Sequence, residues 1–134
     1  MHGLIPVVAV VLLVGCGDDD APPAPDCPAL ADCRDEGRCT AEQDRCVAAS
    51  DADCRQRSEV CARTGKCTAT GGTCIATTDE DCKASSWCAV YGGCHAQQGR
   101  CLALSDADCQ SSSGCKQYGW CTVNMQGECV KVGP

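Results

Sequence analysis

Apolar positions divide the chain into two very different parts. Residues 4–15 form an almost wholly apolar run, whereas in residues 26–134 the apolar position that recurs most regularly is cysteine. Sixteen of these cysteines fall into four sets of four, and the first cysteines of successive sets lie 27 or 28 residues apart. Self-similarity at a fixed period of this length predicts a tandem array in which each unit is a small cysteine module.

This rhythm defines four repeats, which we number 1 to 4: residues 26–49, 50–77, 78–104 and 105–134. Their cysteines are, in order, Cys27, Cys33, Cys39 and Cys46; Cys54, Cys61, Cys67 and Cys74; Cys82, Cys88, Cys94 and Cys101; and Cys109, Cys115, Cys121 and Cys129. Each repeat holds an even, self-contained set, so we expect disulfide bonds to stay within a repeat.

The polar residues before the first cysteine predict the start of a helix. Repeats 2 to 4 each have a Ser or Thr followed three residues later by Asp, in the pairs Ser50 and Asp53, Thr78 and Asp81, and Ser105 and Asp108. This arrangement is typical of a capping box. Repeat 1 lacks it, and there Asp26 is the expected cap, with Pro28 early in the helix.

A glycine two residues before every third cysteine predicts where the helix ends. These glycines are Gly37, Gly65, Gly92 and Gly119, and the position suits a left-handed helix end. The third and fourth cysteines then enclose short polar stretches, most with a glycine, which favour strand, turn and strand. The predicted fold class is a small disulfide-rich array of four four-cysteine units, each a short helix plus a β-hairpin.

The predicted helix limits the disulfide pairing. First and second cysteines lie six or seven residues apart, which in a continuous helix separates them by roughly 9–10 Å along the axis. A disulfide tolerates Cα separations up to only about 7 Å, so first-to-second pairing is disfavoured. Two patterns remain open: first with third and second with fourth, or first with fourth and second with third.

Composition indicates that cysteines must carry the fold. The chain of 134 residues has no Phe, two Trp and two Tyr, so side chains able to fill a core are scarce. Each repeat is shorter than the roughly 40 residues at which a chain folds without staples. A disulfide contributes about 2–4 kcal/mol and needs an oxidising compartment. The net charge of −7 comes without a basic stripe, which argues against nucleic acid as a partner.

The apolar run has the length of a secretory signal rather than of a membrane span. It ends in Leu13-Val14-Gly15-Cys16, which resembles the lipobox of bacterial lipoproteins. The resemblance implies a signal peptide over residues 1–15, lipidation of Cys16 and membrane attachment through that lipid. The first three residues depart from the pattern because they include no Lys or Arg. The alternative is an ordinary cleaved signal in which Cys16 is incidental.

Residues 16–25 predict an extended tether, since three consecutive Asp residues repel one another and three Pro residues favour polyproline geometry. In lipoproteins of this kind, an Asp directly after the lipidated Cys retains the protein at the inner membrane. Gly17 occupies that place here. We therefore expect an exported lipoprotein of the cell envelope, at the outer membrane.

Other chemistry finds less support in the sequence. Thiolate metal sites typically use C-x-C or C-x2-C spacing, whereas the closest cysteines here have five residues between them. The Asp-x-Asp pairs at the helix starts are not followed by a calcium loop, and capping already explains them. His95 is the only histidine after the leader, and we interpret it as an isolated surface residue. We expect no metal, no cofactor and no enzymatic activity.

The aromatic residues gather in repeats 3 and 4, at Trp87, Tyr91, Tyr118 and Trp120. One interpretation is a patch that binds a glycan or a protein. The other is that these side chains cover the disulfides or the junction between the two repeats.

The Ser-Asp-Ala-Asp-Cys starts and the four-cysteine rhythm, over residues 26–130, resemble uncharacterised cysteine-rich tandem repeats of bacterial lipoproteins. The resemblance implies export and a stapled fold, and it brings no known activity. We expect a membrane-anchored, disulfide-stapled envelope lipoprotein that acts as a structural or adhesive module towards a cell-surface protein or glycan. A thiolate metal-binding protein and a protease inhibitor are the alternatives.

Overall fold

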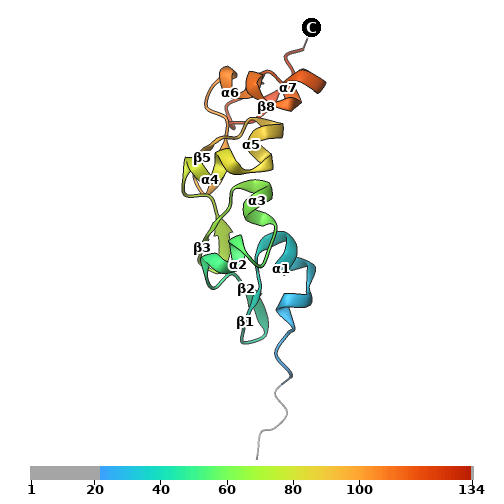
Figure 1. The fold of residues 1–134 in the computed structure, drawn as a ribbon, viewed down its shortest axis with the longest axis vertical. Coiled ribbons are helices and arrows are strands. Elements are labelled where there is room, and N and C mark those ends of the chain that lie inside the picture. The colour runs from blue at the N-terminus through green and yellow to red at the C-terminus, as the bar shows by residue number, and fades with distance from the viewer. Residues whose placement is uncertain (1–21, 134) are drawn as a thin grey trace, which may run out of the picture.

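Four similar units stacked end to end form an elongated molecule (Figure 1). The computed structural model of the protein describes residues 22–133, and in it the repeats follow one another along the long axis. Each repeat has a helical part followed by a two-stranded antiparallel hairpin, and each hairpin is a separate sheet. The predicted fold class, a small disulfide-rich tandem array of four-cysteine units with helix and hairpin, is confirmed.

The helical part of each repeat consists of two short segments, whereas the sequence predicted a single helix. The first cysteine of a repeat lies in the first segment and the second cysteine lies in the second segment. The segments are the 3-10 helix η1 (Cys27–Ala29) and the α-helices α1 (Ala31–Glu36), α2 (Asp51–Arg55), α3 (Val60–Thr64), α4 (Asp79–Ala84), α5 (Ser86–Tyr91), α6 (Asp106–Ser111) and α7 (Ser113–Tyr118).

Buried serines explain the break in repeats 3 and 4. Ser85 and Ser112 have extended backbones, with ψ of 154° and 155°. The hydroxyl of Ser85 donates to the carbonyl of Cys82 and accepts from the amide of Cys88. The hydroxyl of Ser112 likewise donates to the carbonyl of Cys109 and accepts from the amide of Cys115. A side chain that bonds the end of one helix and the start of the next competes with a continuous helix.

The predicted helix signals are present in most repeats. The Ser or Thr at the start of repeats 2 to 4 accepts from the amide three residues later, and the boxes at Ser50 and Ser105 are complete in both directions. The second segments end at the four predicted glycines, with φ between 73° and 76°. Asp26 is wrong as a side-chain cap because it makes no capping hydrogen bond, although Pro28 does lie in the first turn.

The hairpins also form as expected, and they place the fourth cysteine in the second strand. In repeat 1 Cys46 faces Ala41, and an alanine faces the fourth cysteine in repeats 2 and 3 as well. The strands are β1 (Thr40–Glu42) with β2 (Arg45–Val47), β3 (Thr68–Thr70) with β4 (Thr73–Ile75), β5 (His95–Gln97) with β6 (Arg100–Leu102), and β7 (Thr122–Val123) with β8 (Cys129–Val130).

Eight disulfides join the helical part of each repeat to the remainder. Four long bridges span 19 or 20 residues: Cys27–Cys46, Cys54–Cys74, Cys82–Cys101 and Cys109–Cys129. Four short bridges span 6 residues: Cys33–Cys39, Cys61–Cys67, Cys88–Cys94 and Cys115–Cys121. The structure therefore selects first with fourth and second with third. The expectations that bridges stay within a repeat and avoid first-to-second pairing are confirmed.

The long disulfides of repeats 2 and 3 are each covered by an alanine of the preceding repeat. Ala48 of repeat 1 packs with Cys54 and Cys74 of repeat 2, and Ala76 of repeat 2 packs with the Cys82–Cys101 bridge of repeat 3. The amides of Ala48, Ala76 and Ala103 each donate, over 2.9 Å, to a hairpin glycine carbonyl of the following repeat. The Ala48-Ala49 segment between repeats 1 and 2 is therefore a packed joint.

Three of the four glycines that end the helices also bring the repeats into close contact. At Gly65 a Cβ atom would collide with the Cys101 sulfur and would lie 2.9 Å from the Cys82 Cα, both in the following repeat. Gly37 and Gly92 lie in the same way against the long disulfides of repeats 2 and 4. Glycine is thus required at these positions for two reasons: the backbone is left-handed, and the next repeat approaches too closely for a Cβ atom.

Candidate binding site on repeats 3 and 4

The structure brings the four aromatic residues singled out in the sequence into one row that crosses from repeat 3 to repeat 4. Ring centroids are 4.5 Å apart for Trp87 and Tyr91, 6.1 Å for Tyr91 and Trp120, and 4.7 Å for Trp120 and Tyr118. Trp87 and Tyr91 share one face of α5 because they are four residues apart in a helix. We call these four residues the aromatic row.

The aromatic row remains open to solvent. Trp87 is 38% exposed, Tyr91 41% and Tyr118 55%, while Trp120 is half-buried. The row spans the junction between the two repeats, which agrees with the structural interpretation. It also leaves a large part of three rings exposed side by side, which is typical of an interaction surface.

Two glycines allow the tryptophan rings to lie against the backbone. A Cβ atom at Gly93 would come within 2.6 Å of Trp87 Cδ1, and one at Gly114 within 3.0 Å of Trp120 Cε3. Trp87 and Gly114 each directly precede the second cysteine of their repeat, and Gly93 and Trp120 each directly precede the third. Repeats 3 and 4 therefore use the same pair of positions, with tryptophan and glycine exchanged.

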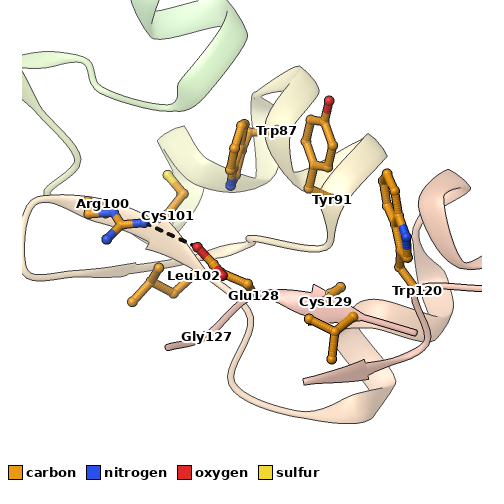
Figure 2. A pocket seen from close by; sticks show the side chains of 10 residues that line it. Trp87, Tyr91, Arg100, Cys101, Leu102, Trp120, Gly127, Glu128 and Cys129 are labelled. Carbon is orange, nitrogen blue, oxygen red and sulfur yellow. Dashed lines mark ion pairs between the residues drawn. The ribbon is translucent and has the colours of Figure 1, made fainter. Parts of the chain in front are cut away.

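A hollow of about 260 Å³ lies beside the aromatic row. Its walls include Trp87, Tyr91 and Trp120, together with residues of β6 and β8 such as Leu102 and Val130. Arg100 and Glu128 supply its charged groups, and their nearest side-chain atoms are 3.9 Å apart. Figure 2 shows this ion pair below the rings, between the two repeats.

Sequence reasoning missed Arg100 and Glu128, although a signal was available. Both residues directly precede the fourth cysteine of their repeats, so they occupy equivalent places in consecutive hairpins. Stacking of the repeats brings these places together. Alignment of the repeats would have shown their equivalence, but only the stacking shows that they line the same hollow as the rings.

The Asp-x-Asp pairs bind the helix starts to their surroundings. The first Asp of each pair accepts a 2.8 Å hydrogen bond from a hairpin amide of its own repeat: Asp51 from Ala69, Asp79 from Ala96 and Asp106 from Val123. The second Asp contacts the preceding repeat. Asp53 accepts from Thr40, Asp81 pairs with Arg55, and Asp108 contacts His95. Capping is therefore only part of their role.

The interpretation of His95 as an isolated surface residue is wrong. Its Nδ1 lies 2.9 Å from Asp79 Oδ2 in its own repeat, and its Nε2 lies 3.3 Å from Asp108 Oδ1 in the next repeat. Carboxylates only accept hydrogen bonds, so both contacts are satisfied when both ring nitrogens carry a proton. In its charged form, His95 therefore donates a hydrogen bond to a carboxylate of each of repeats 3 and 4.

The pKa values of these groups shift in the direction that favours the charged link. The hydrogen bonds that His95 donates to Asp79 and, to a smaller extent, to Asp108 raise the pKa of His95 above its usual value, against the opposing effect of burial. A hydrogen bond from the Ala96 amide, with a smaller one from His95, lowers the pKa of Asp79. Burial acts to raise the pKa of Asp108, but hydrogen bonds from Leu104, Ser105 and His95 lower it overall.

The cysteines of the described residues do not present thiolates. One group with the spacing of a metal site, formed by Cys61, Cys67 and Asp81, includes two sulfur atoms that are bonded to each other. A sulfur in a disulfide has no proton to lose and does not act as a thiolate ligand. Cys16 and the leader, where lipidation is expected, lie outside the described residues. Within residues 22–133 no helix has the length and apolar character that a membrane span needs.

No family model, curated protein or solved structure matches this chain. The class of protein is therefore defined by the fold itself: a cysteine-rich tandem array in which every repeat is stapled by two disulfides. Bridges in this number indicate an extracellular or envelope protein, because the cytosol keeps thiols reduced.

Proposed function

We propose that the protein is a lipid-anchored envelope lipoprotein whose repeats form a rigid stalk that presents a binding surface away from the membrane. The anchor is the lipidated Cys16, and residues 16–25 are the tether. The stalk is the stapled array, and the aromatic row on repeats 3 and 4 is the binding surface. The role is structural and adhesive rather than catalytic.

One observation carries this proposal, namely the place of the aromatic row in the stack. Repeat 1 lies at the N-terminal end of the array, and repeats 3 and 4 form the opposite end (Figure 1). A chain attached to a membrane through its N-terminal part would hold the exposed rings furthest from the lipid. The packed joints between repeats support a stalk that keeps this distance.

The anchor is tested by the variant Cys16→Ser. We expect the full-length protein to sediment with membranes and to have an intact mass that includes acyl chains, and the variant to lose both properties. Gly17→Asp is the matched control, because it keeps Cys16 and alters only the residue after it. That control should stay in the membrane fraction and move to the inner membrane. Retention of Cys16→Ser in membranes would contradict the proposed anchor.

Adhesion is tested on cells that display the protein. Binding of these cells to host cells or to an immobilised polysaccharide should fall when Trp87 and Trp120 are both changed to Ala, while the amount of displayed protein stays constant. Leu30→Ala is the control, because Leu30 is also an exposed apolar residue but lies in repeat 1. Equal adhesion by the unchanged protein, the double tryptophan variant and Leu30→Ala would contradict the binding role of the row.

The alternative of a thiolate metal-binding protein is addressed by alkylation before reduction. The disulfide pairing leads us to expect no alkylated cysteine in repeats 1 to 4 and no bound metal. Many reactive thiols, or a stoichiometric metal, would make metal sequestration the better explanation.

A further inference from the structure

We propose that the hollow beside the aromatic row binds a neutral sugar ring within an oligosaccharide. This inference rests on the proposed function and deepens it, because it names the class of ligand that the distal surface would take. It is carried by the unusual residues of this junction, the balance of charge in the hollow and its size.

The repeat does not need aromatic residues at these positions in order to fold. In repeat 1 the residues before the second and third cysteines are Asp32 and Arg38, whose charged groups lie 3.9 Å apart. In repeat 2 they are Val60 and Lys66. Repeats 3 and 4 instead place a tryptophan opposite a glycine, so that the ring lies close to the backbone. Ion-paired or aliphatic residues occupy the same positions in repeats 1 and 2, so a repeat of this kind folds without tryptophan there.

The hollow is lined by one cation and one anion, and therefore has no net charge from its walls. Arg100 and Glu128 are 3.9 Å apart and each remains more than half exposed, at 58% and 56%. Glu128 would repel an anionic ligand, and Arg100 would repel a cationic ligand. A neutral ligand with several hydroxyl groups meets neither obstacle, and the pair offers it both N–H donors and carboxylate acceptors.

Ring faces and hydroxyls are the two features that a sugar presents. One face of a pyranose carries C–H groups, whose slight positive charge complements the negative face of an aromatic ring. Each hydroxyl both donates and accepts. The hollow has Trp87, Tyr91 and Trp120 on one side and Arg100 with Glu128 on another, as Figure 2 shows. A sugar ring that stacks on the row would thus reach the polar pair with its hydroxyl edge.

The dimensions favour a small ring with extensions rather than a bulky ligand. The volume of about 260 Å³ is below the ~300–1,000 Å³ of pockets for drug-sized molecules. Three rings of the row line the hollow, and the fourth, Tyr118, continues the row beyond it, with its centroid 4.7 Å from that of Trp120. One sugar would occupy the hollow, and its neighbour in an oligosaccharide would contact Trp120 and Tyr118.

Intrinsic fluorescence tests this inference directly, because both tryptophans of the chain belong to the row. Purified full-length protein with intact disulfides, in a polyoxyethylene detergent that contains no sugar, is titrated with maltotetraose, cellotetraose and chitotetraose. We expect a saturable change in tryptophan emission with at least one of them. Tetramethylammonium and a proline decapeptide are titrated in parallel as probes for a cation cage and a polyproline groove.

Variants connect the signal to the hollow. Trp87→Ala and Trp120→Ala each keep one tryptophan as reporter, and each should weaken binding at least about tenfold. Arg100→Ala changes an exposed side chain and guards against loss of folding as the explanation; it should weaken binding several-fold. Arg45→Ala is its matched control, since Arg45 also precedes a fourth cysteine but lies in repeat 1. That control should bind like the unchanged protein.

The titrations would overturn the inference in two ways: if none of the three sugars bound at millimolar concentration, or if tetramethylammonium or the decapeptide bound more strongly than the sugars. Equal loss in Arg45→Ala and Arg100→Ala would also overturn it, because the effect would not come from the hollow. These failures differ from failure of the proposed function. If displayed protein still adheres to cells through Trp87 and Trp120, the binding role stands and only the ligand class is wrong.

Discussion

The Nε2 atom of His95 in repeat 3 lies 3.3 Å from a carboxylate oxygen of Asp108 in repeat 4. Asp108 also forms the capping box that starts repeat 4. A side chain that titrates near neutral pH therefore contacts the structural start of the next repeat. We therefore predict that the junction between repeats 3 and 4 depends on pH.

The raised pKa of His95 predicts that this junction is most stable in mildly acidic solution. The contribution of His95 is fully present below its unfolded pKa of about 6.5, and it is lost as pH rises through the higher folded pKa. The contribution of Asp79 and Asp108, whose pKa values are lowered, is present above about pH 3.9 and is lost on further acidification. Thermal stability should thus be greatest between about pH 4 and 6.5.

His95→Thr tests this dependence, because Thr occupies the equivalent position in the other three repeats. The melting temperature of the unchanged protein should fall between pH 6 and pH 9 on the order of a few degrees. The variant should lose most of that change. A fall of equal size in both proteins would show that another group is responsible.

Gly65→Ala should destabilise the stack more than Gly119→Ala. Both glycines have left-handed backbones, with φ of 73° and 75°, so alanine costs about 1–2 kcal/mol at either place. Only at Gly65 would the new Cβ collide with the next repeat, whereas at Gly119 the nearest atoms belong to Lys131 at 3.8 Å. The collision should add about 1–3 kcal/mol, measured by denaturant unfolding without reductant. Equal effects would mean that the repeats do not pack closely.

Removal of a long disulfide should cost more than removal of a short one in the same repeat. Cys54–Cys74 closes 20 residues and Cys61–Cys67 closes 6, and this difference in loop length corresponds to about 1 kcal/mol in the chain-entropy model. Cys54 is also fully buried and packs with Ala48. Replacing each pair by two serines and measuring urea unfolding checks the order. A larger loss for the short bridge would show that strain or packing outweighs chain entropy.

Asp53→Ala should loosen the junction between repeats 1 and 2. Asp53 is 1% exposed and accepts hydrogen bonds from the side chains of Thr40 and Arg57 and from the amide of Ala49. Its loss removes these hydrogen bonds and leaves the part-buried hydroxyl of Thr40 without its partner, at a cost of about 1–3 kcal/mol in unfolding free energy. Asp44→Ala, at an exposed hairpin turn, is the control and should change little. Amide hydrogen exchange at Ala49 gives a local reading of the same effect.

The sequence predicted the repeat well because its signals are local. A cap such as Ser50 acts on an amide three residues away, and a glycine such as Gly92 acts through its own φ angle. The single predicted helix was wrong for a local reason as well. The hydroxyls of Ser85 and Ser112 bond to backbone groups at the helix ends and so interrupt the helix. The spacing of the cysteines does not reveal this role.

The candidate site was only half predictable. Trp87, Tyr91, Tyr118 and Trp120 stood out because they are the only aromatic residues of the chain, but the sequence did not show whether they meet. Arg100, Glu128 and the role of His95 were missed. These residues act across the junction of two repeats, and a contact across a junction depends on how far one repeat is rotated and shifted against the next.

The period of the cysteines, the helix caps and the hairpins were determined by the sequence alone, because each depends on residues within a few positions of one another. The choice of first-with-fourth and second-with-third pairing was decided by the tertiary structure, since both open patterns satisfied the spacing. The same holds for the stacking of Gly65 on the Cys82–Cys101 disulfide and for the continuous aromatic row. These features join side chains that are close only after the repeats have packed, which no local pattern encodes.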